Sequence, residues 1–186
     1  QLLRVSIDGT QSVLYSGDKK VFDHLFDENG QLLFIRLAGE REHEIYQLNG
    51  QEMEWQLVHT SNVLDKVHMV RFDQANNELY VVAYNEGDLI SVHALHLSNK
   101  TSRLIHQDPA QTVDIIGVVK SNKTQEILLT SYYADQLRTI AVHPAMEAGI
   151  ETINNSLNGP MSGAPKSSVT VTADLSNPYW LVRQSG

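Results

Sequence analysis

Apolar and polar residues alternate along the stretch from 67 to 105, which predicts short strands rather than helices. Successive side chains of a strand point to opposite faces, and the β-branched and aromatic residues here suit a half-buried sheet. Polar clusters at 73–77 and 85–88 interrupt the pattern as turns do. The predicted strands are 67–72, 78–84, 89–97 and 101–106. Four strands joined by tight turns predict one antiparallel meander, the unit that forms a blade of a β-propeller.

The same pattern recurs along the chain at intervals expected for such blades. Phe26 and Phe72 begin matching turn-and-strand segments 46 residues apart, and Glu78 and Glu126 are 48 residues apart in a third copy. Propeller blades repeat about every 40–50 residues. Because one meander cannot bury both of its faces, repeated units must stack on one another. The recurrence therefore predicts an all-β fold, specifically a β-propeller.

We expect residues 1–186 to form a single, partial β-propeller domain. The predicted four-stranded blades are 21–60, 65–107 and 111–167, with half blades at 1–18 and 168–186. Within 145–157, apolar residues recur at helical spacing, which predicts one short helix inserted in the third blade. Both ends resemble cuts from a longer polypeptide. The half blades could pair into one composite blade, whereas in a fragment their open edges would favour a homodimer.

Composition and charge narrow the classes of function. The chain has a net charge of −8, so its surface does not favour a nucleic-acid backbone as partner. It contains no cysteine, which excludes disulfides, thiolate metal sites and a cysteine nucleophile. No apolar run approaches the roughly 18–20 residues that cross a bilayer, so we expect no membrane partner.

The residues that could bind a metal ion do not fall into a metal-ligand pattern. His93 and His96 are three residues apart on a predicted strand, so they point to opposite faces. The acidic loops that begin at Asp8, Asp27 and Asp73 lack the frame of a calcium loop and are better explained as hairpin turns. We therefore expect neither a metal site nor a cofactor.

Five residues are the candidates for binding a ligand. Arg36, Arg71 and Arg138 lie near the ends of predicted strands, where an arginine could hold a peptide carboxylate through two hydrogen bonds. Tyr132 and Tyr133 could line a surface that faces a ligand. The simpler interpretation is that the arginines are solvated or ion-paired and that the tyrosines pack between blades.

The segment 132–183 resembles a known family. Its strand ending LRTIAVHP, its helical AMEAGIETINNSLNG and its YWLVRQSG are similar to the propeller of bacterial prolyl oligopeptidase-family serine peptidases, of the acylaminoacyl-peptidase or dipeptidyl-peptidase-like type. The specific part of the resemblance covers about a quarter of the chain. It implies a propeller that admits only short peptides to a separate catalytic domain.

The catalytic chemistry of that family is not expected in this chain. Its α/β-hydrolase domain carries a G-x-S-x-G nucleophile elbow, whereas residues 159–163 read G-x-x-S-G in a proline-rich loop. The resemblance thus implies no catalytic residue here and a peptide substrate met through a missing C-terminal α/β-hydrolase domain. The location stays open, because the lack of cysteine fits a bacterial cytoplasm and a periplasm equally. The alternatives are a stand-alone propeller scaffold for a protein or peptide partner and a propeller enzyme such as a lactonase or glycosidase.

Overall fold

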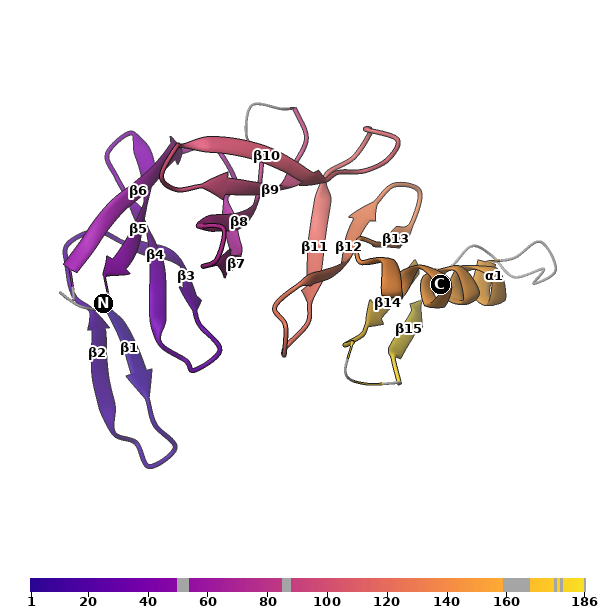
Figure 1. Cartoon of the computed structure of the whole chain (residues 1–186), viewed down its shortest axis with the longest axis horizontal. Helices are drawn as coiled ribbons and strands as arrows, with labels where there is room; N and C mark the ends of the chain where they lie inside the picture. Colours follow the sequence, from indigo (N-terminus) through magenta and orange to yellow (C-terminus); the bar gives the residue numbers. More distant parts are fainter. Residues whose placement is uncertain (50–53, 85–87, 159–167, 176, 178, 186) are drawn as a thin grey trace. The chain divides into compact units, whose positions relative to one another are not determined.

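The structure, a computed structural model, describes residues 1–49, 54–84, 88–158, 168–175, 177 and 179–185 (Figure 1). Over these residues the chain is mostly β-strand in several antiparallel sheets, so the prediction of an all-β fold is confirmed. The chain divides into two compact units, which are described separately. The first is Gln1–Ala83 with Ala94–Arg103, and the second is Tyr84–His93 with Leu104–Gly186.

Three meander sheets account for the strands up to residue 106. The sheets follow chain order, with β1 beside β2, β3 to β6 in one four-stranded sheet, and β7 to β10 in another. The division between the two units passes through β9 and β10. The strands are β1 Leu2–Val5, β2 Gln11–Tyr15, β3 Val21–Phe26, β4 Leu32–Ala38, β5 Glu42–Asn49, β6 Glu54–Asn62, β7 His68–Asp73, β8 Glu78–Ala83, β9 Ser91–His96 and β10 Thr101–His106.

The first hairpin of successive sheets contains the same kind of turn. A residue near the end of this turn is left-handed, with φ of 74° at Gly30, 52° at Asn77 and 59° at Gln125. A side-chain oxygen of the first turn residue, Asp27, Asp73 or Ser121, accepts hydrogen bonds from backbone N–H groups inside the turn. Glycine and asparagine tolerate this backbone region, whereas glutamine adopts it at a cost. The repeat predicted from sequence is thus present as a repeated local structure.

The core of the first unit lies between sheets that follow one another in sequence. Phe34 and Ile45 from the β3–β6 sheet and Leu79 from β8 are fully buried in one apolar cluster. The rings of Phe34 and Phe72 meet edge to face, with centroids 4.9 Å apart. A second cluster around Ile35 packs against the β1–β2 hairpin through Leu14. Apolar burial on both faces of the β3–β6 sheet holds its neighbours in place.

The second unit departs from the prediction in the sheet that corresponds to the third predicted blade. Only three strands form it over the described residues, β11 Ile115–Lys120, β12 Ile127–Tyr133 and β13 Leu137–Ala141, so the prediction of a four-stranded third blade is wrong there. The helix α1, Pro144–Asn158, begins three residues after β13. His143 caps the start of this helix. Its carbonyl accepts the N–H of Met146 and its Nδ1 accepts the N–H of Ala145. The loop predicted at 158–167 lies almost entirely outside the described residues.

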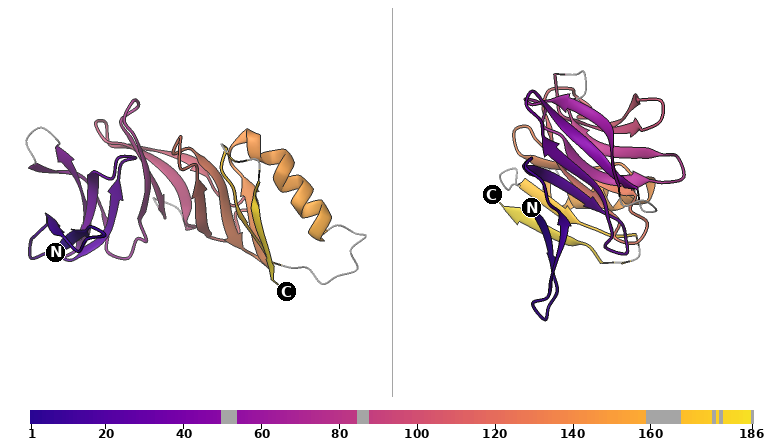
Figure 2. Two further views of the ribbon diagram at one scale, coloured as in Figure 1. Left: turned by 90° about the horizontal axis from the view of Figure 1, so that it is seen from below. Right: turned by 90° about the vertical axis from the view of Figure 1, so that its left-hand side faces the viewer.

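The helix packs against β14, Ser168–Thr172, which pairs with β15, Leu181–Ser185 (Figure 2). Met146 and Ile150 of α1 join Leu128 of β12 and Val171 of β14 in one buried cluster. Trp180 lies directly over Gly149, where an added Cβ would fall 2.1 Å from the indole ring. The amphipathic spacing read in the sequence therefore marks the face of α1 that covers the second unit's core.

Candidate functional site

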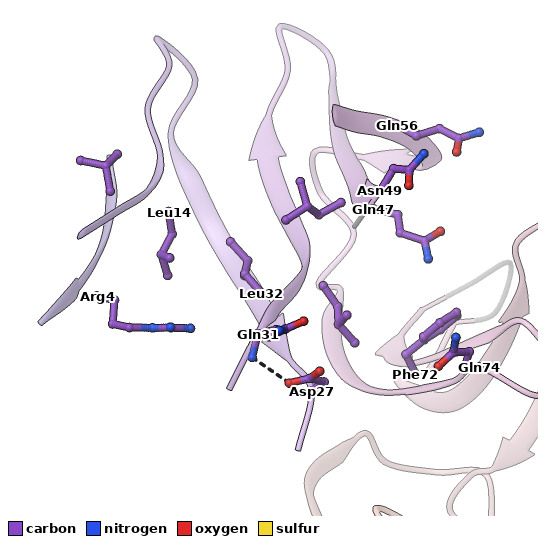
Figure 3. Close-up of a pocket in the computed structure, with 13 residues that line it drawn as sticks. Arg4, Leu14, Asp27, Gln31, Leu32, Gln47, Asn49, Gln56, Phe72 and Gln74 are labelled. Atoms are coloured by element: carbon purple, nitrogen blue, oxygen red, sulfur yellow. Dashed lines mark hydrogen bonds between the residues drawn. The ribbon is translucent and has the colours of Figure 1, made fainter. Parts of the chain in front are cut away.

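A cavity of about 750 Å³ opens in the first unit beside the turn ends of its sheets. Figure 3 shows its walls, to which the β1–β2 hairpin, the β3–β4 turn, β5, β6 and the β7–β8 turn each contribute. Its polar lining is dominated by side-chain amides, joined by one cation and one carboxylate. These polar residues are Arg4, Asp27, Gln31, Gln47, Asn49, Gln56 and Gln74.

The strand register places two of the amides together. Gln47 of β5 and Gln56 of β6 are paired positions across the two antiparallel strands, so their side chains leave the sheet on the same face. Asn49 lies two residues beyond Gln47 and points to that face as well. Figure 3 shows Gln47 and Gln56 projecting from neighbouring strands on one side of the cavity.

The two charged residues of the cavity are engaged in holding its walls. The guanidinium of Arg4 donates a hydrogen bond to the carbonyl of Gly30 and so ties the β1–β2 hairpin to the β3–β4 turn. Asp27 Oδ1 accepts hydrogen bonds from the N–H groups of Asn29 and Gln31 at 2.9 and 2.7 Å. Within the described part of the chain, the side-chain amides of Gln47 and Gln56 have no hydrogen-bond partner.

This lining suits binding rather than covalent chemistry. Among the described residues, the cavity wall contains no serine, threonine, cysteine, lysine, histidine or tyrosine. A carboxamide donates through its nitrogen and accepts through its oxygen, so it can pair with another amide in both directions. Leu14, Leu32 and Phe72 add apolar side chains to the lining. Phe72 packs in the cluster of Phe34, which shares a sheet face with Gln47, whereas Leu14 and Leu32 pack in the Ile35 cluster on the other face. The site can therefore hold a neutral ligand that carries both hydrogen-bond donors and acceptors and some apolar surface.

The five residues selected from the sequence do not line this cavity. Arg36 lies within β4, where its Nη1 is 3.0 Å from His43 Nδ1 and its guanidinium covers the ring of Phe22 at 5.4 Å. Burial lowers the pKa of Arg36, and the nearby Asp23 carboxylate opposes that effect. Arg36 is therefore held inside the packed sheet.

Arg71 contacts one residue of its own strand, β7, and one residue of the paired strand, β8. Its Nη2 lies 3.1 Å from Asp73 Oδ2, and its guanidinium stands 4.6 Å from the ring centre of Tyr80. The side chain is 14% exposed. An ion pair and a cation–π contact thus occupy both the charge and the flat face with which an arginine would bind a ligand.

Arg138, Tyr132 and Tyr133 belong to the second unit. Tyr132 and Arg138 are paired positions on β12 and β13, and Arg138 also binds Asp135, with Nη2 2.8 Å from Oδ1. Partial burial and the charge of Asp108 raise the pKa of the Tyr132 phenol. Tyr133 is 58% exposed. The structure brings Tyr132 and Arg138 together, but the carboxylate of Asp135 already occupies the guanidinium.

A carboxylate links the first strands of two successive sheets. Asp23 Oδ2 on β3 accepts the N–H of Met69 on β7 at 2.8 Å and lies 3.0 Å from Nδ1 of His68. Burial on its own would raise the pKa of Asp23, but these hydrogen bonds outweigh burial and keep the pKa below its ordinary value. Sequence reading missed this link because it joins residues 46 positions apart.

In the described part of the chain, no three His, Cys, Asp or Glu side chains gather closely enough to bind a metal ion. None of its helices combines the length and apolar character needed to span a bilayer. The chain matches no family model, no curated protein and no solved structure.

Proposed function

We propose that this chain is the non-catalytic β-propeller portion of a prolyl oligopeptidase-like serine peptidase, where it binds or gates short peptide substrates. The observation that carries the proposal is the recurrence of one meander with one turn. Two four-stranded sheets have the same strand order, and the left-handed turn residues Gly30, Asn77 and Gln125 are 47 and 48 positions apart. Radial repetition of such sheets is the propeller architecture.

The contact between β3 and β7 favours a propeller over a two-layer sandwich. Both are the first strands of their sheets, and Asp23 joins them directly through the N–H of Met69. In a propeller, equivalent strands of neighbouring blades adjoin one another around the centre. In a sandwich, two sheets face each other across a shared core instead.

The amide-lined cavity supports peptide as the ligand class. Peptide bonds carry one donor and one acceptor per residue, which is the pairing that glutamine and asparagine side chains offer. The absence of serine, threonine and cysteine among the described residues of its wall is compatible with a binding role. In this proposal a separate α/β-hydrolase domain with a G-x-S-x-G serine performs the hydrolysis.

A second candidate, a scaffold that binds a folded protein partner or forms a homodimer, has one observation in its favour. The β1–β2 hairpin exposes Leu3, Val5 and Val13, and a two-stranded sheet is marginal by itself. An unpaired sheet edge beside such residues is a surface to which another chain could add strands.

Titration with a library of capped five- to eight-residue peptides, followed by mass spectrometry of the same mixture, tests the proposal. We expect saturable binding of short peptides without cleavage. Cleavage by this chain alone would contradict the non-catalytic role. Binding to folded proteins with no binding to peptides would favour the scaffold. The coding sequence downstream of residue 186 offers a separate check, because we expect it to encode an elbow serine.

A further inference from the structure

We propose that Arg36 and His43 form an acid-sensitive switch in the first unit: neutral His43 holds the guanidinium of Arg36, and protonation of His43 releases it toward the carboxylate of Asp23. The inference goes beyond the proposed function and does not depend on it. It is carried by the geometry of the pair, by the burial of Arg36 and by the position of Asp23.

The bond between the two side chains exists in only one protonation state of His43. Arg36 Nη1 on β4 lies 3.0 Å from His43 Nδ1 on β5. A guanidinium can only donate hydrogen bonds, so Nδ1 must accept with a lone pair, which a neutral imidazole has and an imidazolium lacks. Protonation of His43 therefore replaces this hydrogen bond by two cations at close range.

The guanidinium has few other contacts that could hold it. Among the described residues, His43 is its one hydrogen-bond partner, and Arg36 Nε is buried without any. The ring centre of Phe22 lies 4.7 Å from that of His43 and 5.4 Å from the guanidinium carbon of Arg36, so one aromatic ring covers the pair. Phe22 is 45% exposed, which leaves the pair close to solvent and its protons.

Asp23 offers a second partner on the same face of the sheet. Asp23 of β3 and Arg36 of β4 are paired positions, and the carboxylate attracts the guanidinium by its charge. The carboxylate oxygens accept the N–H groups of His24 and Met69 at 2.8 Å each. Because a carboxylate has about four acceptor sites, it can accept a further bond from Arg36. Protonated His43 thus leaves Arg36 with a second position.

The charges around the pair act in both directions. Burial and the adjacent guanidinium lower the pKa of His43, and the charge of Asp65, which follows β6, opposes them. His68 of β7 lies 3.0 Å from Asp23 and, once protonated, competes with Arg36 for that carboxylate. At neutral pH these effects leave His43 uncharged and its bond to Arg36 intact. The charged and titratable residues near the pair are Lys20, Asp23, His59, Asp65 and His68.

The switch should make acid weaken the first unit. The unfolded chain binds a proton at His43 near pH 6.5, whereas the folded chain binds it only at lower pH. The folded state thus loses stability relative to the unfolded state as the pH falls below about 6.5, and this loss stops growing once folded His43 is itself protonated.

An NMR titration of the whole chain between about pH 8 and pH 4 tests the switch without any variant. We expect the ring C–H signals of His43 to titrate with a midpoint below about pH 6.5, and the Nε–H signal of Arg36 to shift with the same midpoint. His43→Asn identifies the histidine signal and keeps an acceptor oxygen near the place of Nδ1. In that variant the Arg36 signal should no longer shift at this midpoint. It should still do so in the control His24→Asn, which changes an exposed histidine of β3.

Urea unfolding at two pH values gives a thermodynamic readout. From about pH 7.5 to pH 5.5, the unfolding equilibrium constant should rise about two- to tenfold more in the unaltered chain than in His43→Asn. The upper limit follows because an unfolded histidine is about ten-to-one protonated at pH 5.5. Arg36→Met removes the neighbouring charge and should raise the His43 midpoint.

The position of Arg36 after release is tested by Asp23→Asn. We expect a smaller acid-induced shift of the Arg36 Nε–H signal in this variant, because the charged acceptor is gone. An unchanged shift would show that Arg36 does not turn to Asp23, which overturns the second half of the switch.

Three results would overturn the first half. A His43 midpoint at or above pH 6.5 would show that the folded chain does not keep the ring neutral. An Arg36 signal that does not follow His43 would show that the two side chains are not coupled. Equal pH dependence of stability in His43→Asn and the unaltered chain would show that the bond contributes nothing. If a variant fails to fold, the titration of the unaltered chain still decides whether the two side chains are coupled.

Discussion

Replacing Asp23 by alanine should remove the hydrogen bond that joins β3 and β7, the first strands of two successive sheets. Asp23 Oδ2 accepts the N–H of Met69 at 2.8 Å and lies 3.0 Å from His68 Nδ1. Met69 is 2% exposed, so no water can readily replace the lost acceptor. The change is therefore expected to leave a buried backbone donor without a partner, which is a costly state.

The expected loss follows from the environment of each partner. A hydrogen bond to a charged acceptor contributes roughly 1.5–3 kcal/mol. The side chain of His68 is 71% exposed, so its pairing with Asp23 adds only about 0–1 kcal/mol. Together these give a decrease of about 1.5–4 kcal/mol in the free energy of unfolding of the first unit. Asp23→Asn keeps one acceptor oxygen and should lose less.

Hydrogen exchange at the Met69 amide in urea-free buffer, together with urea unfolding, measures this loss. Asp18→Asn is the matched control, because Asp18 is an exposed residue of the same unit and its loss should change stability by less than about 0.5 kcal/mol. Unchanged protection of the Met69 amide in Asp23→Ala would refute the reasoning. So would a urea midpoint equal to that of the control.

The charged form of Asp23 should also make the stability of the first unit depend on pH. The pKa of Asp23 lies below its ordinary value of 3.8 in the folded protein. Its charged form thus stabilises the fold fully above that value, and this contribution is lost as the pH falls through the folded-state pKa. The difference in stability between the unaltered chain and Asp23→Asn should therefore be larger at about pH 5 than below about pH 4.

Three other substitutions test the turn, the core and the helix. Gly30→Ala should lower stability by about 1 kcal/mol in thermal unfolding, because φ is 74° there; an unchanged midpoint would contradict the left-handed turn. Leu79→Ala should cost about 2–5 kcal/mol in urea unfolding, since this side chain is fully buried, and a loss under 1 kcal/mol would contradict its place in the core. Gly149→Ala should destabilise the second unit and shift Trp180 fluorescence, because the new Cβ meets the indole ring. Since alanine by itself favours a helix over glycine, a stabilised variant would contradict that contact.

The positions of the strands could be predicted because the signals that set them are local. β10, Thr101–His106, has the predicted bounds, and α1, Pro144–Asn158, extends one residue beyond the predicted 145–157 at each end. Alternation fixes the strands, and polar turn residues separate them. The three-stranded sheet β11–β13 differs from the predicted blade 111–167, because the helical spacing after Pro144 opposes a fourth strand there.

The cavity could not be predicted because its residues meet only through strand register. Gln47 and Gln56 become neighbours when β5 pairs with β6, and Gln31 and Gln74 come from turns of different sheets. In the sequence, none of these glutamines gives a signal of a shared site. The arginines are charged residues near predicted strand ends, but Arg71 and Arg138 pair with Asp73 and Asp135, which lie two and three residues away in the sequence. Such close acidic neighbours indicate an ion pair within the chain rather than a ligand-binding arginine.

A crystal structure of the chain tests the central proposal, that its sheets repeat radially, most directly. The account predicts that β3, β7 and β11, the first strands of successive sheets, lie nearest a common axis, with the Asp23–Met69 bond intact between the first two. Two sheets facing each other across one shared core, with no such axis, would contradict it.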